Sequence, residues 1–243
     1  MVKTVNKIAV IVFGPQGSGK GTQAELLAKK LDLFHFDSGS YLRTLLHNPA
    51  LQKNKIIRRE RKLNEAGVLN TPSWILRTTA EIIKRATALG QGIVFSGSMR
   101  TFYETFGHNE NEKPNKKNGG VIDVLKRYYG NKNIFIFLLD IPEKESIKRL
   151  TERFVCSVCK GLLIRSELIG LGKIKFKICP FCGGKIVHRI DDNKKAILVR
   201  LKEYKERTQP IFKELEKGGY KIHKIDGRPM PYKIHEAILK KLK

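Results

Sequence analysis

The chain has few cysteines and few acidic residues, and it has no long hydrophobic run. No apolar stretch in its 243 residues approaches the roughly 20 residues that a membrane-spanning helix needs. The N-terminal stretch MVKTVNKIAVIVFGP lacks a small-residue cleavage site, so we expect no signal peptide and a cytoplasmic protein. All four cysteines fall in two Cys-x-x-Cys pairs, which leaves none for a secretory disulfide framework or a free thiol.

Acidic residues number 23 against 48 lysines and arginines, which gives a formal net charge of +25. Such a charge indicates an anionic partner, a nucleic acid or a solvated basic surface, and composition alone does not choose among them. The runs KNKIIRRERK (53–62) and KKLK (240–243) are candidate RNA contacts. In a chain this rich in lysine, however, a solvated face is the more common meaning of such runs.

The length and the hydrophobic pattern predict a large α/β domain. Short apolar runs alternate with segments of helical periodicity, and 41% of the residues are hydrophobic, enough for a sizeable core. Strands that are apolar nearly throughout are typical of a parallel sheet covered on both faces, so we expect a doubly wound α/β fold. The expected strands are IAVIVF (8–13), LFHF (33–36), GIVFS (92–96), NIFIFLLDI (133–141) and YKIHKID (220–226).

Three stretches interrupt this alternation. Residues 38–70 are basic and helical in pattern, residues 154–190 carry the cysteines and several glycines, and residues 107–120 have the composition of a polar loop. We interpret the first two as insertions that can move on the rigid sheet.

The stretch FGPQGSGKGTQ (13–23) lies between an expected strand and an expected helix, the context that raises a glycine-rich match above chance. Glycines let successive backbone N–H groups point into one concavity, and the helix N-terminus adds partial positive charge. Lys20 then reaches the terminal phosphates of a nucleotide. The generic pattern has Ser or Thr directly after this lysine, but here Gly21 intervenes and the hydroxyl comes at Thr22. The sequence therefore predicts a phosphate-binding loop, the P-loop.

The ending GKGTQ resembles the nucleoside monophosphate kinases, and the adenylate kinase family in particular. DSGSYLR (37–43) is similar to the family's STGDMLR, GVLN (67–70) to its GxLV, and FSGSMRT (95–101) to its LDGFPRT. Essentially the whole chain is covered, because further matches follow in family order at KRLTER (148–153), RIDD (189–192), VRL (199–201) and IDG (225–227).

The resemblance implies a three-layer P-loop fold with a five-stranded parallel sheet, a helical acceptor-binding insertion and a small zinc-ribbon LID that closes over ATP. It implies Mg²⁺-dependent, reversible transfer of the terminal phosphoryl group of ATP to a nucleoside monophosphate by a monomeric enzyme. Residues 1–37, 71–153 and 190–243 then form the P-loop core, residues 38–70 the monophosphate-binding insertion, and residues 154–189 the LID.

The cysteines have the spacing of a structural zinc site, with Cys156 and Cys159 in the first pair and Cys179 and Cys182 in the second. Four thiolates complete a tetrahedral shell and leave no position for a substrate water, so we expect no catalytic role for the metal. The resemblance makes this segment the LID, which is too small to hold a core unaided, so zinc takes the place of that core. The alternative is a zinc ribbon that grips nucleic acid.

Phosphoryl transfer between nucleotides requires aligned reactants, neutralised charge and exclusion of water. The acceptor is itself an anionic phosphate oxygen, so no general base is needed, and none of the familiar nucleophile or paired-carboxylate arrangements is evident. The planar fork of arginine matches phosphate oxygens. The resemblance places Arg149 against the donor base and Arg153 on its phosphates, Arg43 and Arg100 on the acceptor phosphate, and Arg189 and Arg200 over the transferred group.

The resemblance thus implies three overlapping sets of site residues. The catalytic set is Lys20, Arg100, Arg153, Arg189 and Arg200. The ATP-binding set is Gly17, Ser18, Gly19, Lys20, Gly21, Thr22, Arg149 and Arg153. The monophosphate-binding set is Ser38, Arg43, Val68, Leu69, Asn70, Gly97, Arg100, Glu104, Arg189 and Arg200.

Two serines depart from the family pattern. Ser96 stands where LDGFPRT has its Asp, a carboxylate that helps to hold Mg²⁺ through water, and Ser40 replaces the Asp of STGD. The metal is then held more weakly, or another acid such as Asp37 or Asp140 takes over, or the protein binds nucleotides without turnover. Six arginines in family register favour weaker or rearranged Mg²⁺ binding. Met99, which replaces Pro, is expected to change only the stiffness of its turn.

Glu104 stands where the family usually has Gln, which can donate to N1 of adenine and accept from the adenine amino group. A carboxylate only accepts, and guanine offers two donors on the corresponding edge, so GMP stays open as an acceptor. A water or Ser38 can instead rescue AMP. We expect AMP first and GMP second. The other hypothesis is a basic nucleic-acid-binding protein that has a P-loop but no kinase turnover.

Overall fold

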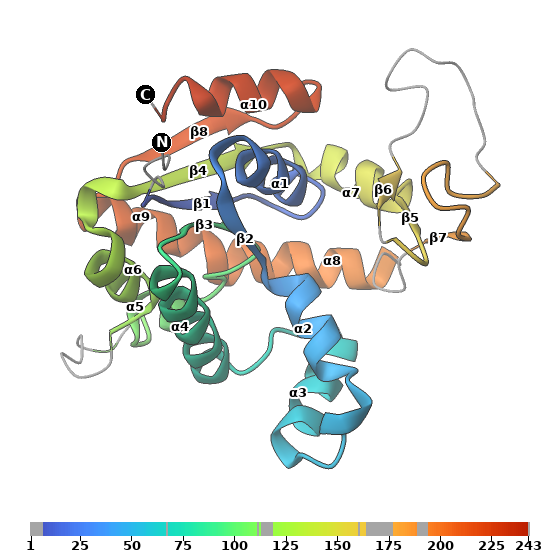
Figure 1. Cartoon of the computed structure of the whole chain (residues 1–243), viewed down its shortest axis with the longest axis horizontal. Coiled ribbons are helices and arrows are strands. Elements are labelled where there is room, and N and C mark those ends of the chain that lie inside the picture. Colours follow the sequence, from blue (N-terminus) through green and yellow to red (C-terminus); the bar gives the residue numbers. More distant parts are fainter. Residues whose placement is uncertain are drawn as a thin grey trace.

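The predicted parallel sheet is confirmed. The computed structural model describes residues 7–66, 68–110, 112, 119–159, 161–163, 177–188 and 194–242. Five parallel strands lie in the order β2-β3-β1-β4-β8, so the P-loop strand β1 is central (Figure 1). They are β1 (Ala9–Phe13), β2 (Leu33–Asp37), β3 (Gly92–Ser96), β4 (Ile134–Asp140) and β8 (Ile222–Asp226).

Helices cover both faces of the sheet because successive strand residues point to opposite sides. In β1, Ala9, Ile11 and Phe13 join one hydrophobic cluster, and Val10 and Val12 join the other. Figure 1 shows the corresponding helices on the two sides of the sheet. The second cluster is completed by α1 (Lys20–Leu31) and α10 (Pro231–Leu239), and the first by α4 (Pro72–Ala88), α6 (Val121–Tyr129) and α9 (Gln209–Lys217).

The stretch predicted as the acceptor-binding insertion is helical and extends away from the sheet (Figure 1). Leu42, Leu46 and Ile57 pack with Ile75 of α4 into a separate small core. The stretch contains α2 (Ser38–Leu46), the 3-10 turn η1 (Pro49–Leu51) and α3 (Lys55–Glu65).

The cysteine segment follows α7 (Glu143–Thr151) and forms an antiparallel sheet in the order β6-β5-β7. Its strands are short: β5 (Phe154–Cys156), β6 (Leu162–Leu163) and β7 (Ile186–His188). The chain returns to the main sheet through α8 (Lys194–Glu203) and the π-helical turn η5 (Tyr204–Thr208). The remaining short elements are α5 (Phe102–Phe106) and η2 (Asn131–Asn133).

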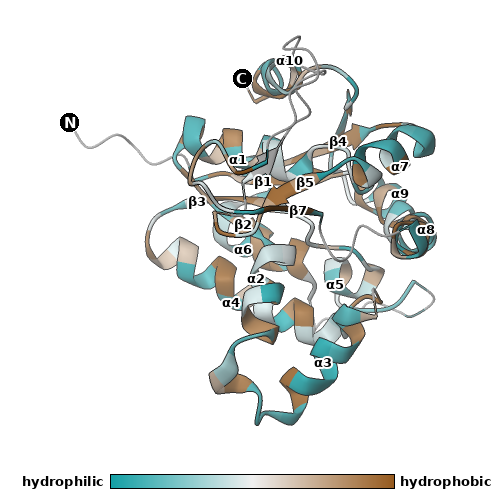
Figure 2. Ribbon diagram, turned by 90° about the vertical axis from the view of Figure 1, so that its right-hand side faces the viewer, coloured by the Kyte–Doolittle hydropathy of each residue, from teal (hydrophilic) through white to brown (hydrophobic). Residues whose placement is uncertain are grey.

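The hydropathy of the chain follows this layering. Figure 2 shows hydrophobic strands in the interior and hydrophilic residues over much of α3 and α8. Among the residues that the structure describes, no helix combines the length and the apolar character that crossing a membrane requires.

Candidate active site

The P-loop adopts a conformation that depends on glycine. Gly14 has φ 145°, and a Cβ added there would lie 2.5 Å from the carbonyl oxygen of Leu139. Gly19, with φ 93°, precedes the first residue of α1. Both backbone angles are accessible to glycine and costly for other residues. The loop therefore passes close against β4 and delivers Lys20 at the start of a helix.

Lys20 is held inside this loop. Its Nζ donates to the carbonyl oxygens of Gly14 and Pro15, each at 2.7 Å. Burial, followed by the nearby charges of Arg100 and Arg153, lowers the pKa of Lys20 to about 7, while Asp37 acts in the opposite direction. These three cations converge although they lie far apart in the sequence, and a polyanionic ligand among them would stabilise the charged lysine.

The back of the P-loop is fixed by α7. The Ser146 hydroxyl donates to the Gln16 carbonyl at 2.6 Å. Arg149 forms an ion pair with Glu145 at 2.6 Å, and its Nη1 donates to the Gly17 carbonyl at 3.4 Å. The same guanidinium donates to the carbonyls of Gly227 (2.8 Å) and Arg228 (3.0 Å). Arg149 thus joins the P-loop, which was predicted to bind ATP, to the segment after β8.

Two glycines, Gly39 and Gly97, lie beside two arginines, and Gly97 leaves space that the Arg100 guanidinium occupies. A Cβ on Gly39 would lie 3.4 Å from Nη1 of Arg43 and 3.9 Å from Nη2 of Arg100. A Cβ on Gly97 would lie 2.8 Å from Nη2 of Arg100 and 3.2 Å from Oγ of Ser38. The structure therefore brings together four members of the predicted monophosphate-binding set: Ser38, Arg43, Gly97 and Arg100.

Arg100 is held by its backbone as well as by its side chain. Its Nε donates to the Gly97 carbonyl at 2.5 Å, and its backbone N–H donates to Oε2 of Glu104 at 2.9 Å. Thr208 of η5 donates its hydroxyl to the Arg100 carbonyl at 2.8 Å. Glu104 was predicted to read the acceptor base. It is only 2% exposed, and this burial raises the pKa of its carboxyl group.

The turn before Arg100 differs from the expectation for Met99. Met99 has φ 55° and is 1% exposed, with its side chain in the core cluster beneath the sheet. Proline is locked near φ −65°, so it cannot adopt this angle. The exchange of proline for methionine therefore accompanies a backbone angle that proline cannot adopt, and the expectation that only stiffness changes is wrong.

The residues of the stretch 68–70 differ in how far they are buried. Val68 is 41% exposed and Leu69 is half-buried. Asn70 is buried and donates to the Glu60 carbonyl at 2.7 Å and to Glu60 Oε2 at 3.1 Å. Glu60 also accepts from the backbone N–H and hydroxyl of Thr71, at 2.9 and 2.6 Å. Asn70 therefore fastens α3 to the chain leading into α4.

Of the arginines placed over the transferred group, Arg189 lies outside the described residues. The Arg200 backbone carbonyl accepts from Nε2 of Gln16 at 3.4 Å, so α8 runs beside the P-loop. The P-loop also contains the buried hydroxyl of Ser18, which has no hydrogen-bond partner within the described ranges. Such a hydroxyl is suited to a phosphate oxygen or a metal-bound water.

The four cysteines converge as their spacing predicts. Their Sγ atoms all lie within 4.8 Å of one another, at 3.4 Å for Cys156 and Cys182 and 3.7 Å for Cys159 and Cys179. The Val158 N–H donates to the Cys156 sulfur at 3.3 Å. Gly184 lies against that sulfur, since a Cβ there would come within 2.8 Å of it. The donor set and its backbone hydrogen bonding fit a tetrahedral Zn²⁺ site.

Ser96 and Ser40 lie at the ends of neighbouring elements. Ser96 Oγ is 2.9 Å from Nε2 of His35. The backbone N–H of Ser40 donates to Oδ1 of Asp37 at 3.2 Å, so Asp37 caps α2. The carboxylate at this edge of the sheet therefore belongs to β2.

A parallel sheet with a P-loop after its central strand defines a nucleotide-binding protein of the P-loop class, and residues 13–155 match the AAA domain family. The chain is 30% identical to an adenylate kinase of Methanothrix thermoacetophila, over 96% of this chain and 97% of that one. It is 30% identical to one from Chlamydia trachomatis serovar D, over 96% and 89%, and 29% identical to one from Clostridium tetani, over 94% and 95%.

The chain belongs to the adenylate kinase family. It is accordingly an enzyme, a nucleoside monophosphate kinase, and the resemblance inferred from its motifs is confirmed.

Proposed function

We propose that the protein transfers the terminal phosphoryl group of ATP to AMP and forms two ADP, reversibly. The observation that carries this proposal is the convergence of Lys20, Arg100 and Arg153 at the P-loop, with Arg43 beside Arg100. These cations match a donor triphosphate on the P-loop side and an acceptor phosphate on the α2 side. The relatives named adenylate kinase support the same reaction.

In this mechanism a phosphate oxygen of the monophosphate attacks the terminal phosphorus of ATP. The bond from that phosphorus to the bridging oxygen of the ADP leaving group breaks, and no proton has to move. Lys20, Arg153 and the P-loop N–H groups hold the donor phosphates, Arg43 and Arg100 hold the acceptor, and Arg189 and Arg200 neutralise the transferred group. Pre-positioned charges of this kind supply most of the catalysis in phosphoryl transfer.

We assign the finer details to this chain as part of the proposal. Residues 38–70 bind the monophosphate and residues 154–189 form a LID that excludes water, on the core of 1–37, 71–153 and 190–243. Cys156, Cys159, Cys179 and Cys182 hold a structural Zn²⁺. Thr22 and Asp37 would hold Mg²⁺, which would supply positive charge to the ATP phosphates.

The acceptor base is the least constrained part of the proposal. Glu104, the residue predicted to read the base, is buried and accepts from the Arg100 N–H through Oε2, so it does not by itself choose between adenine and guanine. The relatives named adenylate kinase favour AMP, which therefore ranks first, with GMP second.

A coupled assay for ADP formation with ATP, Mg²⁺ and each of AMP, GMP, CMP and UMP tests the proposal. Turnover should be fastest with AMP, and Lys20→Met should reduce kcat by at least about a hundredfold, because it removes a phosphate-facing charge. The matched control is Lys29→Met, the same substitution at an exposed position on the same helix. A strong preference for CMP or UMP, or no turnover with any acceptor, would contradict the proposal.

A further inference from the structure

Asp37 and Ser96 face each other across neighbouring strands. In the β2–β3 register Asp37 pairs with Ser96, and in the β1–β3 register Ser96 pairs with Val12. The three residues therefore lie at one level, at the carboxyl ends of the strands, where the P-loop leaves β1. Ligands of parallel α/β sheets bind at this edge.

The two residue types are exchanged relative to the pattern that this chain resembles. STGDMLR has Ser at the position of Asp37, and LDGFPRT has Asp at the position of Ser96. Because the two positions are register partners, the exchange moves one carboxylate sideways by one strand, about 4.8 Å, and keeps it at the same level of the sheet. The Ser96 hydroxyl has its own hydrogen-bond partner, because it lies 2.9 Å from Nε2 of His35.

We infer that Asp37 supplies the carboxylate that orients the hydrated Mg²⁺ of bound ATP, in place of the residue at position 96; this rests on the proposed function. The contact would be through water, as it is for the carboxylate of the family pattern, so the carboxylate needs to lie at the same edge of the sheet and not against the ion itself.

The surroundings of Asp37 support this role. Its charge acts on Lys20, whose Nζ lies within the P-loop. Its Oδ1 lies 3.4 Å from the position of a Cβ on Gly39, the same point that is 3.4 Å from Arg43 Nη1. The carboxylate thus faces the space between the donor loop and the acceptor arginines, where bridging phosphates would lie.

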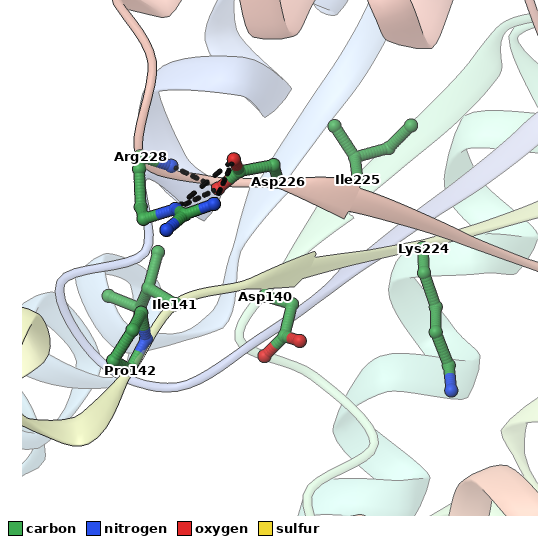
Figure 3. A pocket seen from close by; sticks show the side chains of 7 residues that line it. All are labelled: Asp140, Ile141, Pro142, Lys224, Ile225, Asp226 and Arg228. Atoms are coloured by element: carbon green, nitrogen blue, oxygen red, sulfur yellow. Dashed lines mark hydrogen bonds and ion pairs between the residues drawn. The ribbon is translucent and has the colours of Figure 1, made fainter.

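Asp140, the other candidate acid, lies elsewhere. It ends β4 on the side of β8 and lines a hollow of about 380 Å³ with Lys224 and the ion-paired Asp226 and Arg228 (Figure 3). It also acts on Tyr204, whose pKa it helps to raise after burial. In the strand order of the sheet, β4 lies on the opposite side of β1 from β3. Asp140 therefore does not occupy the position of Asp37 or of Ser96.

The test measures metal affinity, and turnover is not required for it. Mn²⁺ is titrated into the zinc-loaded protein with saturating ATP, and free Mn²⁺ is followed by electron paramagnetic resonance. Asp37→Asn keeps a side-chain acceptor for the Ser40 N–H and removes only the charge. We expect Asp37→Asn to weaken Mn²⁺ binding about tenfold or more while metal-free ATP binding is unchanged.

The double variant Asp37→Ser/Ser96→Asp restores the family arrangement and serves as the rescue, since Ser also caps helices. It should bind Mn²⁺ within about threefold of the unaltered protein. Unchanged Mn²⁺ affinity in Asp37→Asn, equal loss of metal-free ATP binding, or a double variant no better than Asp37→Asn would each overturn the assignment. Failure of the proposed function is separate, because it appears as absent ADP formation in the unaltered protein.

Discussion

Glu104 holds the backbone of Arg100, in contrast to the base-reading role that the resemblance implies. The stretch Thr101–Glu104 forms the start of α5, where the Thr101 hydroxyl accepts from the Glu104 N–H at 3.1 Å. The Glu104 carboxylate reaches back to the Arg100 N–H. This reciprocal pairing resembles a capping box. It fixes the backbone of the arginine that we propose to bind the acceptor phosphate.

We predict that Glu104→Leu lowers kcat/KM by roughly tenfold to a hundredfold with every monophosphate, because an unpaired Arg100 N–H costs about 1–3 kcal/mol. Glu104→Gln keeps an acceptor oxygen and should stay within about threefold, with the same order of AMP and GMP. Steady-state kinetics on both variants, with thermal melting as a check on folding, provide the measurement. A reversed AMP-to-GMP preference in Glu104→Gln would show that the side chain reads the base.

The sequence was sufficient for residues whose chemistry is tied to a fixed spacing. Lys20 in its glycine loop and the paired cysteines were predicted because glycine conformation and tetrahedral thiolate coordination each demand a short local pattern. The network of Glu60 with Asn70 and Thr71 was not predicted, because Glu60 lies in a basic run that indicates solvent exposure. Whether such a side chain turns inward depends on packing between α3 and α4. The T-x-x-E pattern at 101–104 was a usable signal for Glu104 that the family comparison obscured.

Among the elements, the strands of the cysteine segment have the least packing of their own, which is why we propose that a metal stabilises them. Its strands contain two or three residues each, and large apolar side chains remain outside, such as Val158 at 67% and Phe181 at 81% exposure. Strands this short bury too little apolar surface to offset the entropy of ordering the chain. Cross-linking through one ion can supply the missing free energy.

We predict that Cys182→Ser abolishes stoichiometric zinc binding and accelerates amide hydrogen exchange in β5 and β7, while exchange in β1 and β4 changes little. The reason is that the main sheet has its own clusters on both faces. Metal analysis and hydrogen-exchange mass spectrometry measure the two effects. Phe181→Ser, in the same knuckle, is the matched control and should retain zinc. Equal protection of β5 with and without the metal would contradict a structural role.

The structure confirms all five strands of the main sheet; β1, β3 and β4 were predictable as buried apolar runs, whereas the edge strands β2 and β8 are only partly buried and were predicted from their short apolar segments between turn residues. The strands of the cysteine segment were not, because Phe154–Cys156 and Ile186–His188 are too short to show a period of two. Their pairing, with Phe154 opposite His188, follows from the position of the cysteines. The helix α8 that follows them continues into π geometry at Tyr204–Thr208, and this turn directs Thr208 onto Arg100.

The net charge of +25 is larger than the charge of the arginines and the lysine placed at the site. Several cations of the 53–62 run, among them Lys53, Lys55, Arg58 and Lys62, are exposed, whereas Arg59 and Arg61 form ion pairs with Glu60 and Glu65. An exposed basic helix is compatible with a solvated surface and with a polyanion contact. The two differ in their response to salt, because binding to a nucleic acid releases condensed counterions and a closed cleft does not.

We predict that kcat/KM for the kinase reaction falls gently with salt, by about threefold or less between 50 and 300 mM KCl, because its ion pairs form in a site shielded from solvent. Binding of a fluorescent duplex RNA, if measurable at low salt, should fall steeply over the same range. The variant Lys55→Gln/Arg58→Gln/Lys62→Gln removes exposed charge from α3 and should reduce RNA binding while leaving turnover within about twofold. Steep salt dependence of turnover itself, or tight RNA binding in a protein that forms no ADP, would favour the nucleic-acid-binding hypothesis over the kinase.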